Sequence, residues 1–277
     1  MADRGLLGPE SVAWRVIGHP VSIVGGLRSL IVQSLHPLAM AGVAQHSDYR
    51  HRALDRLRRT AYYVAATTFG DTATAHEAAA RVKRVHDRVK GVDPVTGKRY
   101  SASDPETQLW VHCVEWHSFL ATYRTYAGAS LSREEEDRYL AEGVRIAALL
   151  DMDPASVPSS VAEYREYWEE VRAQLCMSES ARGAIDFVLH PPLTRELIPL
   201  QVPLRIASSA AVAIVPGHLR AMAGIDRPAL VRGATVAAVR PAAAALGLPL
   251  LRDAPSLVLG RDTRGLGVEA RRLRSAA

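Results

Sequence analysis

His86 is the residue whose type and position best suit a metal ligand. Apolar residues recur around it at helical spacing, with Val82 and Val85 before it and Val89 after it. This spacing places the imidazole on or beside the buried face of a helix. An axial haem ligand needs one neutral imidazole on a rigid helix in an apolar slot. Because a lone histidine there is more often a hydrogen-bonded core residue, the spacing alone leaves both interpretations open.

Arg56 and Thr60 form a second candidate pair. They are four residues apart, so both project from one face of a helix. An arginine at the edge of an apolar stripe is most often a surface residue that extends its charged end into water. The pair therefore has a functional meaning only if an anionic or oxygen-rich group lies opposite it.

A third cluster, with His112, Glu115, Trp116 and His117, lies within one helical segment. His112 and Glu115 share a face, as metal ligands would. Ferritin-type di-metal centres use Glu-x-x-His on two helices, whereas this chain has the reverse order, and only once. A di-metal centre is therefore a minor alternative. The chain also lacks the GxSxG, P-loop, GxGxxG and HExxH motifs, so the residues alone indicate a helical protein with a candidate histidine ligand.

The elements that must position these residues are predicted to be helices. Apolar residues follow a three- and four-residue period, Ser132 with Glu135 forms a capping box, and Asp104-Pro105 suits a helix start. Helices are expected over about 52–69, from 71 or 72 to about 90, from 105 to at least 123, from 132 to about 150, from 159 or 160 to at least 171, and over about 205–223 and 227–246. The turn-rich segment 91–105 is predicted to be a loop. The expected fold is all-α, a single globular helical domain over residues 1–277.

Composition suits one large helical domain. The chain has 277 residues, 48% of them hydrophobic, and a net charge of +5. Much of that charge comes from five arginines near the end, which are interpreted as a solvated terminal helix; they are Arg261, Arg264, Arg271, Arg272 and Arg274. No aromatic residues alternate with these arginines to stack on bases, so nucleic acid is not an expected partner.

Cysteine usage and hydropathy indicate a cytoplasmic protein. Cys113 and Cys176 lack the CxxC spacing of a zinc or redox site, so two buried thiols in a reducing compartment are expected. Charges near the start argue against a secretory signal. The most apolar run, residues 206–216, is far shorter than the roughly 20 residues that span a bilayer. It is predicted to be a core or interfacial helix, and no transmembrane segment is expected.

Four motifs occur in a fixed order: HPLAMAGVAQHS at 36–47, RLRRTAYY at 56–63, HDRVKG at 86–91 and YSASDPETQLWVH at 100–112. In order and spacing this chain resembles the oxygenase family of the latex-clearing proteins (rubber oxygenases) and the mycophenolic-acid-pathway oxygenase. The resemblance covers about residues 30–225 and leaves 226–277 as a C-terminal helical extension. It implies a globin-like helical core that holds one haem b.

The resemblance also assigns residue roles. It implies that His86 is the proximal iron ligand, that Arg56 and Thr60 lie on the distal side of the haem, and that His112 has a structural or haem-pocket role. A small or lipophilic organic substrate, with dioxygen or peroxide, is the expected partner, and a homodimer is one expected assembly.

Two departures from the family pattern concern activity. Rubber-cleaving members carry a lysine before the distal threonine that can occupy the iron, but Arg59 stands here, and a guanidinium is a poor metal ligand. They also use a glutamate base upstream of the distal arginine, but no glutamate occurs between Glu10 and Glu77. The expectation is a haem-dependent oxygenase or oxidase, with polyisoprene cleavage not assumed. A non-catalytic haem-binding sensor or carrier, and a helical interaction protein without cofactor, remain as alternatives.

Overall fold

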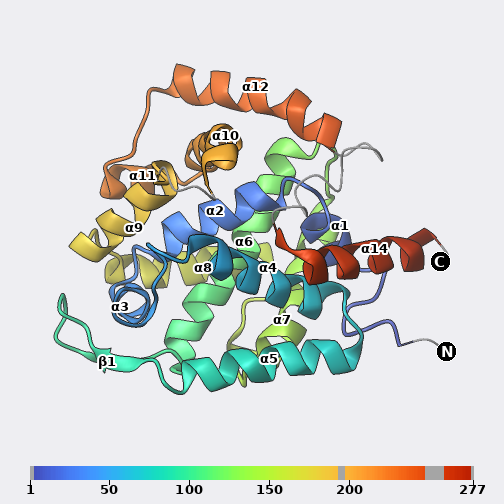
Figure 1. The fold of residues 1–277 in the computed structure, drawn as a ribbon, viewed down its shortest axis with the longest axis horizontal. Helices are drawn as coiled ribbons and strands as arrows, with labels where there is room; N and C mark the ends of the chain where they lie inside the picture. Colours follow the sequence, from blue (N-terminus) through green and yellow to red (C-terminus); the bar gives the residue numbers. More distant parts are fainter. Residues whose placement is uncertain (1–2, 193–196, 247–258, 276–277) are drawn as a thin grey trace.

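The computed structural model describes residues 3–192, 197–246 and 259–275, and these form a helical fold (Figure 1). The helices are α1 (Val12–Ile17), α2 (Ser22–Gln33), α3 (Pro37–His46), α4 (Ala53–Phe69), α5 (Thr72–His86), α6 (Pro105–Tyr126), α7 (Arg133–Ala148), α8 (Val161–Val171), α9 (Glu179–Leu189), α10 (Gln201–Ala213), α11 (Gly217–Ala223), α12 (Ala229–Leu246) and α14 (Arg261–Ser275). Short 3-10 turns are η1 (Pro154–Ser156), η2 (Arg172–Gln174) and η3 (Ile198–Leu200). The predicted all-α fold class is confirmed.

One predicted loop contains a small antiparallel hairpin instead. Strands β1 (Lys90–Val92) and β2 (Arg99–Ser101) pair with Gly91 opposite Tyr100. The carboxylate of Asp93 accepts hydrogen bonds from the backbone N–H groups of Val95 and Thr96, and this turn connects the strands. Three-residue strands are too short to show an alternating pattern, which is why the sequence did not predict them.

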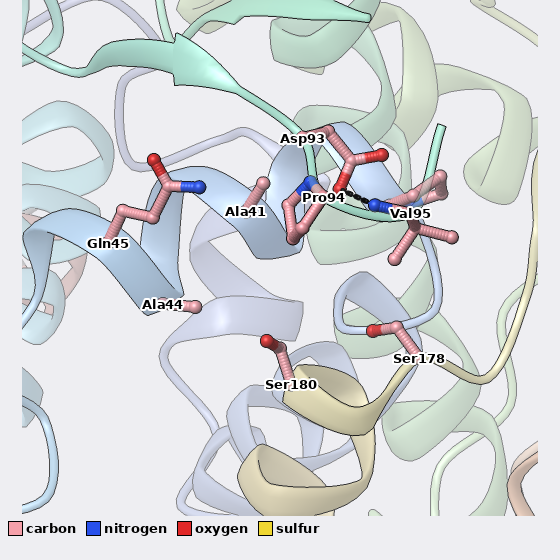
Figure 2. A pocket seen from close by; sticks show the side chains of 9 residues that line it. Ala41, Ala44, Gln45, Asp93, Pro94, Val95, Ser178 and Ser180 are labelled. Atoms are coloured by element: carbon pink, nitrogen blue, oxygen red, sulfur yellow. Dashed lines mark hydrogen bonds between the residues drawn. The ribbon is translucent and has the colours of Figure 1, made fainter. Parts of the chain in front are cut away.

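The turn of this hairpin, α3 and the start of α9 enclose a small pocket of about 60 Å³ (Figure 2). It is lined by Pro37, Ala41, Ala44, Gln45, Asp93, Pro94, Val95, Ser178 and Ser180. A water molecule needs roughly 10–15 Å³ of such space. This pocket therefore has room for a few water molecules and is too small for a large organic group.

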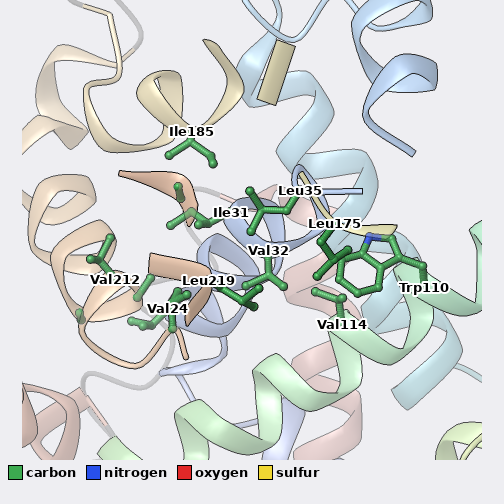
Figure 3. Packing of buried hydrophobic residues seen from close by; sticks show 14 of the residues in the cluster. Val24, Ile31, Val32, Leu35, Trp110, Val114, Leu175, Ile185, Val212 and Leu219 are labelled. Atoms are coloured by element: carbon green, nitrogen blue, oxygen red, sulfur yellow. The ribbon is translucent and has the colours of Figure 1, made fainter. Parts of the chain in front are cut away.

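α2 and α6 cross at the centre of the fold. Gly25 lies so close to α6 that a Cβ atom there would be 2.7 Å from Cδ1 of Phe119. The main core surrounds the crossing (Figure 3) and includes Val24, Ile31, Val32, Leu35, Trp110, Val114, Leu175, Ile185, Val212 and Leu219. The sequence did not predict α2, because Gly25-Gly26 lowers its helix propensity. The close crossing is what requires a glycine at position 25.

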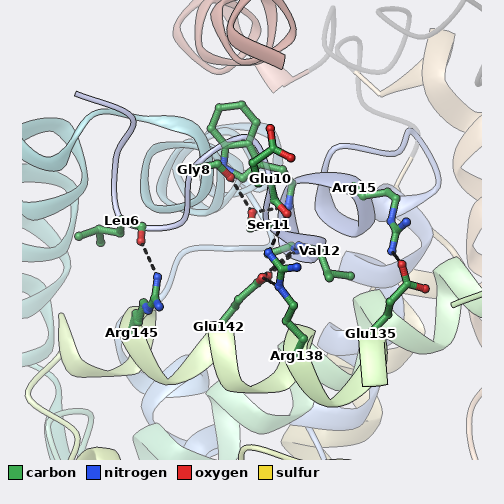
Figure 4. A network of polar contacts seen from close by, with 12 residues as sticks. Leu6, Gly8, Glu10, Ser11, Val12, Arg15, Glu135, Arg138, Glu142 and Arg145 are labelled. Atoms are coloured by element: carbon green, nitrogen blue, oxygen red, sulfur yellow. Dashed lines mark hydrogen bonds and ion pairs between the residues drawn. The ribbon is translucent and has the colours of Figure 1, made fainter. Parts of the chain in front are cut away.

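A second core joins α1, α6, α7 and α8, and a buried carboxylate fixes α1 in it (Figure 4). Glu142 of α7 accepts hydrogen bonds from the backbone N–H groups of Val12 at 3.1 Å and Ala13 at 2.8 Å. The first N–H groups of a helix have no partner within the helix. Arg138 pairs with Glu142 at 3.1 Å, so the carboxylate is neutralised from its own helix.

Most predicted helix starts are confirmed by their caps. Ser132 and Glu135 make both bonds of the capping box, and the Ser160 hydroxyl accepts from the backbone of Glu163. Two helices differ from the prediction in where they end or divide. α5 ends at His86 and not near 90, because the following residues leave to join the hairpin. The stretch 205–223 is divided into α10 and α11, and Pro216, which lacks an N–H group to bond back to the preceding turn, stands directly before α11.

The C-terminal region adds two helices on the outside of the core. α14 packs against α4, where a Cβ atom on Gly260 would be 3.9 Å from Cδ of Arg58. As predicted, its arginines at 261, 264 and 272 are exposed and Arg271 is half-buried; the side chain of Arg274 lies outside the described part. Within the described residues, α12 is long and apolar enough to cross a membrane by length and composition alone.

The two cysteines differ in burial. Cys113 is buried in the second core, as predicted, but Cys176 is only half-buried, and both are free thiols. Cys176 follows η2 in a loop held by a bond from its N–H to the carbonyl of Leu35 at 2.9 Å. A loop position on the rim of the core explains the partial exposure.

Candidate functional site

Arg56 lies half-buried on α4 and is anchored by the end of α3. Its guanidinium donates a hydrogen bond to the hydroxyl of Ser47. Burial lowers the pKa of Arg56, and the charge of Arg59 lowers it further, while Tyr49 has a smaller opposing effect. Thr60 follows one turn later on the same face and is exposed. The structure therefore confirms that the two residues share a face, with Arg56 more enclosed than Thr60.

The end of α3 also holds the hairpin that follows His86. The Gln45 side-chain N–H donates to the carbonyl of Val92 at 3.0 Å, and the Tyr100 hydroxyl donates to Gln45 at 2.8 Å. His46 Nε2 bonds the carbonyl of Lys90 at 3.1 Å. The motif at 36–47 thus connects the α4 motif with the segment after His86.

His86 is the last residue of α5 and lies on its buried stripe. Ala75 and Ala79 are buried and Val82 is half-buried, at the helical steps that lead to His86. The prediction that Val85 belongs to the apolar residues of the buried face is wrong, because Val85 is exposed. Alanines, not valines, form the inner side of α5, which lets α5 pack closely on α4.

The imidazole of His86 has the properties of a neutral ligand. Burial lowers its pKa, against a smaller opposing effect of Asp87. Its Nδ1 is buried and has no hydrogen-bond partner among the described residues. A buried polar atom without a partner costs roughly 1–3 kcal/mol. A site that bonds this ring to a metal or to another group would remove that cost, so the residue fits a haem ligand.

His112 lies on α6 and is more deeply buried than His86. It is buried, its ring stacks at a tilt on Trp116 with centroids 5.6 Å apart, and its Nε2 also lacks a partner among the described residues. Burial lowers the pKa of His112 to about 3. It is the second candidate for ligation.

Glu115 is a site residue that sequence reasoning treated only as a possible di-metal ligand. It lies one turn from His112 on α6, and burial raises the pKa of its carboxyl to about 7. The pKa of Tyr63 on α4 is raised by burial and, second, by the charge of Glu115. Tyr63 comes three residues after Thr60, so the face of α4 that carries Arg56 and Thr60 extends toward Glu115. The available sequence signal was a carboxylate between two apolar neighbours, Val114 and Trp116.

The candidates come from three helices and do not form a ligand cluster. No group of three His, Cys, Asp or Glu side chains that could hold a metal ion occurs in the part of the chain that the structure describes. His86 on α5 and Arg56 and Thr60 on α4 lie on helices that pack against each other, and Glu115 on α6 is close enough for its charge to raise the pKa of Tyr63 on α4. Such an arrangement suits a planar cofactor with one protein ligand better than a multi-ligand metal ion.

One comparison with known proteins identifies a family, and another finds a solved structure with a similar fold. Residues 14–246 match the family "ER-bound oxygenase mpaB/B'/Rubber oxygenase, catalytic domain". A solved structure of latex clearing protein LCP in the closed state has a similar fold, with a TM-score of 0.59 and 16% sequence identity over 96% of this chain and 73% of that chain. No curated protein sequence matches. The family match spans most of the described helices, and the chain therefore belongs to the oxygenase family of the mpaB/B' and rubber oxygenase catalytic domains.

Proposed function

We propose that this chain is a haem b-dependent oxygenase or oxidase that acts on a small or lipophilic organic substrate, with dioxygen or peroxide as oxidant. Family membership supports the reaction class. The observation that carries the cofactor assignment is the buried Nδ1 of His86, which has no partner among the described residues. A neutral imidazole is the form that bonds a metal.

Arg56 and Thr60 would complete the site beside His86. Bound haem supplies an iron at which the oxidant is activated. Arg56 carries a permanent charge on the helix packed against α5, which suits a carboxylate such as a haem propionate. Thr60 offers a hydroxyl one turn away that donates a hydrogen bond to a polar group of the substrate or oxidant.

Glu115 is proposed as the proton-transfer group, in place of the glutamate that rubber-cleaving members of the family carry upstream of the distal arginine. A group with a pKa near 7 exchanges its proton readily at neutral pH, and burial raises the pKa of Glu115 to about 7. The effect of its charge on Tyr63 supports a position of Glu115 near the α4 face. Glu115→Gln should lower kcat more than KM and remove a pH dependence near neutrality, while haem content stays unchanged.

The decisive measurement is the absorption spectrum of protein expressed with a haem precursor. Wild type should show a Soret band that His86→Ala loses and His112→Ala keeps. A band that survives in His86→Ala but is lost in His112→Ala would move the ligand to α6. Protein that stays colourless in all three forms would contradict the haem assignment.

Oxygen consumption separates the enzyme from the alternative of a carrier or sensor. Loaded protein supplied with lipophilic test substrates should consume oxygen, and Arg56→Ala should slow this. An iron that is six-coordinate and inert to added ligands would assign a non-catalytic role instead.

A further inference from the structure

Exposed apolar side chains gather on η3, α10 and α12. Five of the nine large hydrophobic side chains exposed in the described part belong to this region, which we call the α10–α12 face: Ile198, Val202, Ile206, Leu230 and Val231. Leu230 is 84% exposed and Val202 is 68% exposed. α10 and α12 pack against each other, and α12 lies at the outer edge of the molecule (Figure 1). Apolar side chains gathered in this way mark an interaction surface.

The outward side of α12 carries no charge. Leu230, Ala234, Ala237 and Pro241 follow one another along it at helical spacing, and all are exposed. An ordinary surface helix has the opposite arrangement, with polar residues outward. The outward side is therefore suited to apolar surroundings.

The two arginines of α12 are bonded to the protein itself. Arg240 donates from Nε to the carbonyl of Thr125 at 2.8 Å, and Arg232 donates to the carbonyl of Arg227 at 2.5 Å. The Arg240 bond reaches α6 and holds α12 against the body of the molecule, whereas the Arg232 bond closes the start of α12 on the preceding turn. A helix held in this way is suited to lie on a bilayer and not to cross it.

The region is also strongly basic. Residues 197–246 contain five arginines and one acidic residue, Asp226, a difference of four positive charges. Asp226 pairs with Arg220 at 2.8 Å and lies 3.6 Å from Arg232. Arg205 and Arg227 are exposed. The α10–α12 face thus combines apolar side chains with uncompensated positive charge.

We propose that the α10–α12 face binds the surface of an anionic lipid bilayer. Apolar side chains enter the headgroup boundary, and the arginines attract anionic lipids. A second copy of this chain fits less well, because a two-fold contact through the same face would oppose like charges. The inference does not depend on the cofactor or on the reaction.

The test is co-sedimentation of the full chain with vesicles. Wild type should bind vesicles of phosphatidylserine and phosphatidylcholine in equal parts, bind phosphatidylcholine alone weakly, and release when salt is added. Val202→Asp/Leu230→Asp should weaken binding at least about tenfold. Arg205→Ala/Arg227→Ala should weaken binding to the anionic vesicles and leave binding to phosphatidylcholine unchanged.

The hairpin provides a matched control. Val92 and Val95 are 53% and 52% exposed, and Val92→Asp/Val95→Asp should bind vesicles like wild type. The proposal would be overturned if Val92→Asp/Val95→Asp lost as much vesicle binding as Val202→Asp/Leu230→Asp. It would also be overturned if wild type did not bind anionic vesicles. A concentration-dependent dimer, seen by sedimentation velocity, that Val202→Asp/Leu230→Asp abolishes would overturn it as well, because this would assign the face to a second copy.

Discussion

The guanidinium of Arg28 on α2 donates a hydrogen bond to Nδ1 of His117 on α6 at 3.3 Å. Because Nδ1 accepts, the ring proton of His117 is on Nε2 and the ring is neutral. Burial, and then the charges of Arg28 and Arg124, hold the pKa of His117 well below its usual value. Arg28 itself is fully buried, and burial lowers its pKa to about 10.

Removing the Arg28 guanidinium should destabilise the fold. It also donates to the Ser118 hydroxyl at 2.6 Å and to the carbonyl of Ile214 at 3.3 Å. Arg28→Met leaves these acceptors without a donor, so the free energy of unfolding should fall by about 2 kcal/mol or more. Urea unfolding measures this, with the exposed Arg4→Met as control. Equal stability of both variants would show that burial of the charge costs as much as its bonds contribute.

Glu115 should make stability depend on pH near neutrality. Its folded pKa of about 7 lies above its usual value of 4.5, so between these values the folded protein binds more protons than the unfolded chain. Stability should therefore fall as pH rises from 5 to 8, by about 1–3 kcal/mol. Glu115→Gln should remove this slope, while Glu106→Gln, exposed on the same helix, should keep it. A wild-type profile that is flat over this range would contradict the prediction.

His112 should make stability depend on pH in the opposite direction, and at lower pH than Glu115 does. Its folded pKa of about 3 lies below its usual value of 6.5, so the stability that it contributes is complete above 6.5 and is lost as pH falls. Between pH 7 and 5 wild type should lose about 2 kcal/mol more than His112→Phe, which keeps an aromatic contact with Trp116. The exposed His76→Phe is the control and should follow wild type. Thermal unfolding at the two pH values measures the difference.

Glu142 should be essential for the position of α1. Glu142→Ala leaves the N–H groups of Val12 and Ala13 without their acceptor, and the free energy of unfolding should fall by about 2–4 kcal/mol. The exposed Glu166→Ala should change it by less than about 0.5 kcal/mol. Hydrogen exchange should localise the effect to residues 12–17. Unchanged protection of these amides would show that packing alone holds α1.

The amino-acid sequence by itself determined the features that depend on neighbouring residues. The capping box of Ser132 and Glu135, the start of α6 after Asp104 and the position of His86 on an inward stripe all follow from residues within one or two helical turns. The family motifs also predicted the oxygenase family that the comparison confirms. A local bond or a periodic pattern can be read from spacing, because it joins residues that are close along the chain.

Only the tertiary structure decided what the helices bring together. Arg28 meets Ser118 across 90 positions of sequence, and Glu142 meets Val12 across 130. The enclosure of Glu115, which raises its pKa, likewise depends on helices that are distant along the chain. Burial and long-range hydrogen bonding are properties of the assembled core, since a side chain loses its water only when other elements pack over it.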